Sequence, residues 1–135
     1  MTEKFKVLEF PHFEDARGTL TPFEFDQLPF VPQRVYFVTS KNGAVRGGHA
    51  HTIVEEIFVV AHGSVSFLVN DGTGDQKILL DTPNRAVWVR TGCWHELHEF
   101  SDDAVVVAFS STKYLPGDGN YQTDKKEFLK IFRQK

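Results

Sequence analysis

The chain has 135 residues, which is room for one domain spanning 1–135. Its formal net charge of −3 shows no basic surplus, so neither nucleic acid nor an anionic membrane surface is an expected partner. Cys93 is the only cysteine, the N-terminus lacks the apolar run of a signal peptide, and no stretch approaches the roughly 18 apolar residues of a membrane span. These features together predict a cytoplasmic protein.

Short strands separated by turns account for most of the chain. Runs rich in β-branched and aromatic residues end repeatedly at Gly, Pro, Asn or Asp. In chain order the predicted strands are 33–40, 54–60, 64–70, 77–80, 86–89 and 104–110. This spacing favours an antiparallel sandwich or barrel over alternating β and α units. Only residues 124–133 have helical periodicity, so we predict an all-β fold with a short C-terminal helix.

Aromatic residues are concentrated near the N-terminus. Of the 13 phenylalanines, Phe5, Phe10, Phe13, Phe23, Phe25 and Phe30 lie within short segments of the first 30 residues. Most of these rings are expected to pack in the core or in an interface. A barrel of this size cannot easily bury all of them, so we expect a homodimer, with exchange of the N-terminal strands as one arrangement.

The segment 43–63, GAVRGGHAHTIVEEIFVVAHG, concentrates the chemistry of the sequence. His49 and His51 are two residues apart, so on a strand both imidazoles point to the same face. The spacing of Gly43, the His-x-His pair, Glu56 and Gly63 resembles the first motif of the cupins. This pattern, beside the adjacent arginine, favours a functional site over ordinary packing.

A second motif of the cupins is partly present at 90–95, where Gly92 and His95 keep its spacing. Arg90 stands where proline is usual, and Glu99 where asparagine is usual.

The residues of the two motifs are compatible with two kinds of chemistry. His49, His51, Glu56 and His95 would suit an iron, manganese or zinc ion. Alternatively, the histidines act without metal as general acid and base, because an imidazole exchanges protons near neutral pH.

Nearly the whole chain resembles the sugar-nucleotide 3,4-ketoisomerases, which are cupin enzymes acting on TDP-4-keto-6-deoxyglucose. The matching segments, in order, are 15–20, 34–36, 46–51, 71–72, 94–96 and 100–101, followed by the region of Tyr114 and the closing helix. The resemblance implies a jelly-roll-like antiparallel barrel and an isomerase that needs no metal and no other cofactor. The implied substrate is a TDP-linked keto-deoxysugar.

The resemblance also implies roles for individual residues. A base removes the C3 proton, which the C4 ketone acidifies, and reprotonation at C4 leaves the ketone at C3. His49 is the implied base and His51 its partner in proton transfer, while Tyr36 would orient a sugar oxygen and Arg17 would polarise the ketone. The implied substrate-binding residues are Arg46 and Arg34 on the pyrophosphate, Trp94 on the sugar or the nucleobase, and His95 and His98.

Arg17 together with His98 resembles the branch of the family that gives the C4-axial, galacto-like product. That product implies an aminotransferase as the next enzyme, in the synthesis of 3-amino-3,6-dideoxy sugars.

The sequence departs from the family pattern at two positions, with Thr52 for a common lysine and Glu56 for a common glutamine. Because glutamate is a good metal ligand, the second most favoured function is a metal-dependent cupin enzyme. The sequence is also compatible with a 3,5-epimerase, whose chemistry usually relies on a His-Asp dyad, and with a non-catalytic sugar-nucleotide-binding cupin.

Overall fold

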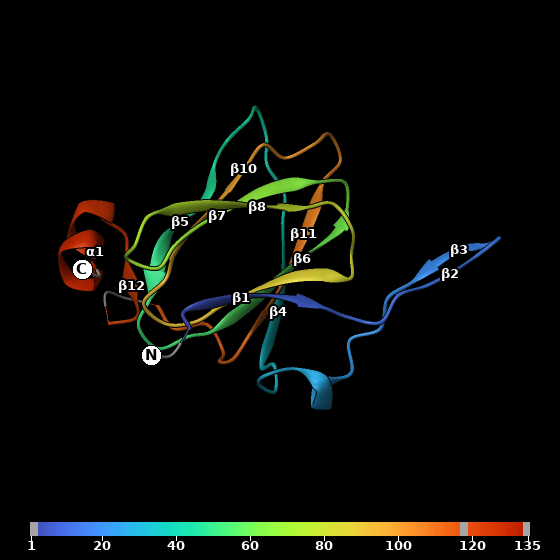
Figure 1. Cartoon of the computed structure of the whole chain (residues 1–135), viewed down its shortest axis with the longest axis horizontal. Coiled ribbons are helices and arrows are strands. Elements are labelled where there is room, and N and C mark those ends of the chain that lie inside the picture. The colour runs from blue at the N-terminus through green and yellow to red at the C-terminus, as the bar shows by residue number, and fades with distance from the viewer. Residues whose placement is uncertain (1–2, 117–118, 134–135) are drawn as a thin grey trace.

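Two five-stranded antiparallel sheets face each other in the computed structural model, which describes residues 3–116 and 119–133 (Figure 1). The first sheet has the order β1 (Phe5–Glu9), β9 (Arg85–Val89), β6 (Glu56–His62), β11 (Val105–Ser110) and β4 (Arg34–Val38). The second has the order β12 (Tyr121–Gln122), β5 (Arg46–His51), β10 (Trp94–His98), β7 (Val65–Asn70) and β8 (Asp75–Leu80). The predicted all-β class is confirmed.

The main core lies between the two sheets. Phe58 of β6 and Phe67 of β7 meet there with ring centroids 4.9 Å apart, and both are almost completely buried. Fully burying one such side chain stabilises the fold by about 1.5–3 kcal/mol. The polar side chain of His95 shares this space and packs against both rings. The apolar core therefore fixes the position of the His95 ring.

Gly63 makes the turn between β6 and β7 possible. Its φ is +76°, which side chains other than glycine rarely adopt. An added Cβ would overlap Oγ of Ser101 and lie 2.9 Å from Cα of Ala104. The turn therefore needs glycine both for its backbone conformation and for the close approach of the loop beside it.

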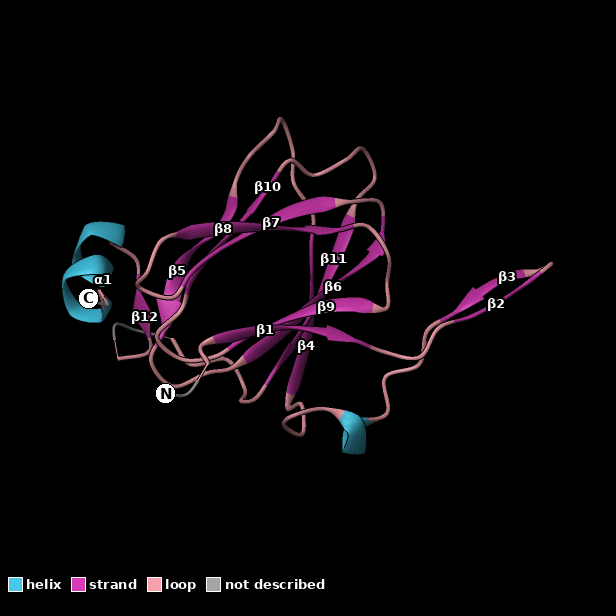
Figure 2. Cartoon of the chain, viewed as in Figure 1, coloured by secondary structure: helices cyan, strands magenta, loops and turns pink. Residues whose placement is uncertain are grey.

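The N-terminal region includes a hairpin that stands away from the barrel (Figure 2). It is formed by β2 (Phe13–Asp15) and β3 (Gly18–Leu20), whose residues are all exposed, and it is followed by the 3-10 helix η1 (Phe25–Gln27). Phe13 and Leu20 are each 61% exposed. The two side chains are cross-strand neighbours and so form one contiguous exposed apolar patch, a feature that marks interaction surfaces when it is large.

The helix α1 (Lys125–Phe132) closes the chain, as the periodicity predicts. The Asp124 side chain caps it by accepting hydrogen bonds from the backbone N–H groups of Lys126 and Glu127. Phe128 is its buried residue and packs on Trp94, with ring centroids 5.8 Å apart. Within residues 3–116 and 119–133, no helix is both long and apolar enough to cross a membrane.

Candidate active site

Three strands bring three histidines and a glutamate together between the sheets. His49 and His51 come from β5, His95 from β10 and Glu56 from β6, and one ligand-type atom of each lies within 4.8 Å of the others. His95 is the direct partner of His49 in the β5–β10 ladder. Gly47, with φ +77°, permits this close approach, since an added Cβ would lie 3.1 Å from the carbonyl oxygen of His95.

Glu56 is the anionic centre of the cluster and is only 2% exposed. Its Oε1 lies 2.9 Å from Nε2 of His51, and its Oε2 accepts hydrogen bonds from Tyr36 at 2.6 Å and Ser110 at 2.7 Å. Burial favours the neutral acid, but the contact with His51 and the hydrogen bond from Tyr36 outweigh it and lower the pKa of Glu56 to about 2. The carboxylate is therefore ionised at neutral pH.

The environment keeps His49 and His95 unprotonated. Burial, followed by the neighbouring His51, lowers the pKa of His49 to about 4. Burial, followed by His49, lowers the pKa of His95 to about 3. A neutral imidazole has a free lone pair, so His49 can act as a base without first losing a proton.

A cavity of about 130 Å³ opens beside His49. Its lining residues come from β4, β5, β6 and β10 and are Tyr36, Val38, Arg46, Gly47, His49, Phe58, His95 and Leu97. His51 is 4% exposed and lies behind His49, with ring centroids 4.8 Å apart. His49 is thus the histidine of the pair that faces the cavity.

Two arginines lie close to these groups. Arg46 lines the cavity and donates a hydrogen bond from Nη1 to the carbonyl oxygen of Thr39 at 2.6 Å. The Arg34 guanidinium lies over the rings of Tyr36 at 4.5 Å and Tyr114 at 5.1 Å. Guanidinium groups in such positions suit an anionic substrate, because they pair well with phosphate oxygens.

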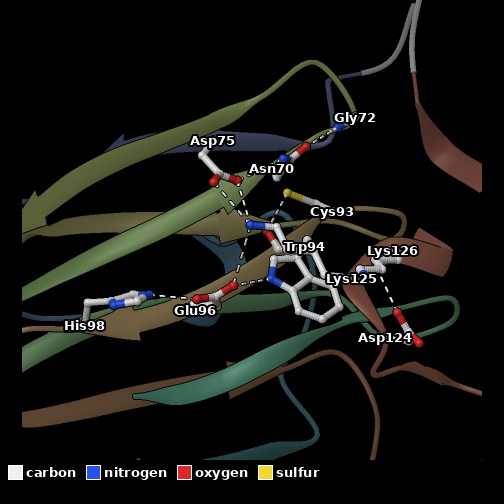
Figure 3. Close-up of polar contacts among 10 residues, drawn as sticks. All are labelled: Asn70, Gly72, Asp75, Cys93, Trp94, Glu96, His98, Asp124, Lys125 and Lys126. Carbon is white, nitrogen blue, oxygen red and sulfur yellow. Dashed lines mark hydrogen bonds and ion pairs between the residues drawn. The ribbon is translucent and has the colours of Figure 1, made fainter. Parts of the chain in front are cut away.

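The structure corrects the placement of Trp94 and His98. Both lie on the outer face of β10, where Glu96 accepts a hydrogen bond from Trp94 at 2.6 Å and lies 2.7 Å from Nε2 of His98 (Figure 3). Successive residues of a strand alternate between faces, so His95 and Leu97 take the inner face. Neither Trp94 nor His98 lines this cavity, and Trp94 packs against α1, so their role in substrate binding stays a prediction.

Arg17 also lies outside the cavity of its own chain. It is at the turn of the projecting β2–β3 hairpin, its side chain is 90% exposed, and it forms an ion pair with Asp15 at 2.6 Å. Among the described residues, those that line the cavity do not include it. The single chain therefore does not bring Arg17 together with His49.

Sequence reasoning missed three residues of the cluster. Ser110 of β11 bonds to Glu56, Asn120 lies 3.0 Å from His51, and the Tyr121 ring lies 5.1 Å from that of His49. Tyr121 is placed by β12, which pairs it with His51 across the edge of the sheet. A two-residue strand leaves no periodic pattern, so no sequence signal could have revealed this pairing.

A family model described as FdtA, WxcM-like, C-terminal matches residues 3–133. The chain belongs to the FdtA family. Among the relatives, a TDP-4-oxo-6-deoxy-alpha-D-glucose-3,4-oxoisomerase from Aneurinibacillus thermoaerophilus is 36% identical over 134 residues, which is 96% of each chain. The predicted resemblance to the sugar-nucleotide 3,4-ketoisomerases is confirmed.

Solved structures agree with the FdtA family assignment. A 3,4-ketoisomerase from Helicobacter canadensis is 31% identical, with a TM-score of 0.86 over 97% of this chain and 98% of that one. A double mutant of the QdtA 3,4-ketoisomerase from Thermoanaerobacterium thermosaccharolyticum, in complex with TDP, is 25% identical, with a TM-score of 0.89 over 98% and 96%. The predicted cupin fold is confirmed by these two 3,4-ketoisomerase structures.

Proposed function

We propose that this member of the FdtA family is a TDP-4-keto-6-deoxyglucose 3,4-ketoisomerase. The observation that carries the proposal is a neutral His49 facing the cavity, backed by His51 and Glu56, in a family with relatives of that activity. The reaction needs a base that takes the C3 proton and a group that moves a proton between the C3 and C4 oxygens. Reprotonation at C4 completes it, so no co-reactant is consumed.

Each role follows from a position in the cluster. His49 takes the C3 proton, since its lowered pKa leaves it unprotonated at neutral pH. His51 is its partner in proton transfer. Tyr36 donates its own hydrogen to Glu56, so its oxygen is free to accept one from a sugar hydroxyl. Arg34 and Arg46 would hold the pyrophosphate.

Proton NMR of the purified protein with TDP-4-keto-6-deoxyglucose in deuterated buffer tests this proposal. We expect a 3-keto product that carries deuterium at C4, in protein assayed as metal-free on the same sample. Binding of the sugar nucleotide without turnover would support a non-catalytic binding protein. Turnover only with stoichiometric metal would support the metal-dependent cupin.

The configuration at C4 is a finer part of the proposal. We propose the C4-axial product, which now depends on Arg17, because His98 lies on the outer face of β10. The face on which C4 is reprotonated decides the configuration. The coupling between the protons on C4 and C5 of the product distinguishes the axial from the equatorial hydroxyl.

We further propose a homodimer in which the hairpin of one copy completes the site of the other. Exposed apolar residues lie on two separate parts of the chain: Phe13 and Leu20 on the hairpin, and Phe37, which is 70% exposed, on the edge strand β4. A symmetric dimer would bury such surfaces. It would also allow Arg17 to reach the cavity of the second copy, which it does not reach in its own.

Two inactive variants should therefore restore activity when they share a dimer. Arg17→Ala and His49→Asn alone are each expected to lack activity, but their heterodimer keeps one site with both residues intact. Random assortment gives about a quarter of wild-type activity, because half of the dimers are mixed and each has one intact site. Co-expression with two different tags and an isomerase assay measure this. A purified heterodimer without activity would show that Arg17 does not act across the dimer.

A further inference from the structure

Asn120 is held in a single orientation by the backbone around it. It is 2% exposed, and its Oδ1 accepts hydrogen bonds from the backbone N–H groups of Ile53 at 3.2 Å and Val54 at 3.3 Å. Its own carbonyl oxygen accepts one from the backbone N–H of Thr52 at 2.8 Å. A flipped amide would turn its NH₂ group toward two backbone donors. The side-chain nitrogen therefore points away from them, toward His51.

This orientation determines where the proton of His51 is. Nδ2 of Asn120 lies 3.0 Å from Nδ1 of His51, and an amide nitrogen can only donate. Nδ1 must accept, so the proton of a neutral imidazole is on Nε2. Nε2 in turn lies 2.9 Å from Oε1 of Glu56, a distance at which two unprotonated atoms would repel each other. Both ends of the ring thus indicate the same tautomer.

We propose that Asn120 is a positioning residue that holds His51 as the neutral Nε2–H tautomer, which makes Nε2 a hydrogen donor and not a metal ligand. A histidine that binds metal through Nε2 donates its Nδ1–H to an acceptor. Here the Asn120 amide offers Nδ1 a donor, which is the wrong partner for that arrangement. The four-residue set of His49, His51, Glu56 and His95 is therefore reduced to three ligands.

The same tautomer suits the reaction, and this half of the inference rests on the proposed function. The tautomer directs the Nε2–H of His51 to Oε1 of Glu56, and the His51 ring lies 4.8 Å from that of His49. This contact fixes the ring that serves as the partner of His49 in proton transfer. Its loss would slow that transfer and leave substrate binding unchanged, because His51 does not line the cavity.

The variant Asn120→Asp tests the inference, because it exchanges the amide donor for an acceptor and keeps an oxygen for Ile53 and Val54. Asn70→Asp is the matched control. Asn70 is a similarly buried asparagine, at 4% exposure, whose Oδ1 accepts the backbone N–H of Gly72 and whose Nδ2 donates to Asp75 (Figure 3). It lies on the outer face of the sheet, among the polar contacts of Trp94 and Glu96.

The first readout is the ¹⁵N NMR spectrum of histidine-labelled protein, with the His51 signals assigned by their loss in His51→Asn. We expect Nδ1 of His51 to be unprotonated in the wild type and in Asn70→Asp, and protonated in Asn120→Asp. A wild-type His51 with its proton on Nδ1 would overturn the inference. This result stands on the wild type alone, should Asn120→Asp fail to fold.

The second readout is titration of the metal-free proteins with Co²⁺ alone. Asn120→Asp is expected to bind Co²⁺ about 10- to 100-fold more tightly than the wild type, because an acceptor at Nδ1 completes the fourth ligand. Equal affinity would contradict the metal half of the inference.

In the isomerase assay, Asn120→Asp should lower kcat and leave KM nearly unchanged. An unchanged kcat with a changed tautomer would contradict only the catalytic half, whereas an inactive wild type would count against the proposed function.

Discussion

His49→Asn should lower kcat for isomerisation by about 10²- to 10⁴-fold, the range that a positioned general base contributes. Asparagine has a similar size and keeps a polar group at the cavity, but it has no lone pair basic enough to take the C3 proton. His49 is the histidine of the pair that faces the cavity, so no neighbour on β5 can replace it. The rate of 3-keto product formation by NMR measures the effect, with TDP binding and thermal unfolding as checks of the fold.

His62→Asn is the matched control for this variant. His62 is an exposed residue at the end of β6 and lies outside the cluster. The variant His62→Asn should isomerise the substrate at the wild-type rate, because the imidazole that it lacks is not in contact with the cavity. If His49→Asn also turned over at the wild-type rate, the base would have to be another residue.

Glu56→Ala should lower the free energy of unfolding by about 3 kcal/mol or more, because three buried donors each lose an acceptor at about 1–3 kcal/mol. Three side chains lose their common acceptor in this variant: Tyr36, Ser110 and His51. A buried donor without an acceptor keeps its full cost of desolvation. Urea unfolding followed by tryptophan fluorescence measures the loss, and a decrease below about 1 kcal/mol would contradict this account of the cluster.

Glu56→Gln is the matched control, because its carbonyl oxygen still accepts a hydrogen bond. It should lose less stability than Glu56→Ala, and its comparison with the wild type gives a second test, by pH. The pKa of Glu56 falls from 4.5 to about 2 on folding, so its carboxylate contributes stability above pH 4.5. That contribution is lost as the pH falls from 4.5 toward 2. Between pH 4.5 and 2 the free energy of unfolding should therefore fall more for the wild type than for Glu56→Gln. An equal fall in both proteins would show that folding does not lower the pKa of Glu56.

Local patterns were enough to predict six of the strands and the shared face of His49 and His51. The two-residue period of a strand places His49 and His51 on one face, and the structure has them there. Turn residues such as Gly63, which lies between β6 and β7, marked the ends of predicted strands, and the helical period identified α1. These features depend on residues close together in the sequence, which is why they can be read without tertiary structure.

The remaining parts of the site depend on contacts between distant segments. Asn120 reaches His51 across 69 residues, and Arg17 could be assigned to a site only by knowing what the hairpin meets. His98 was assigned to substrate binding from the family resemblance, although on a strand it shares a face with Trp94 and lies opposite His95. The face of β10 that points inward was decided by pairing with β5, which no local pattern contains.

The size of the cavity beside His49 limits how much of the substrate it can enclose. At about 130 Å³ it is smaller than the pockets of roughly 300–1,000 Å³ that enclose whole small ligands. For the proposed substrate, the reacting sugar would then lie in this cavity and the nucleoside diphosphate over its rim, near Arg34. Residues other than the proton-transfer groups would then recognise the carrier. Evolution could exchange one nucleotide for another at the rim while leaving the proton-transfer groups untouched.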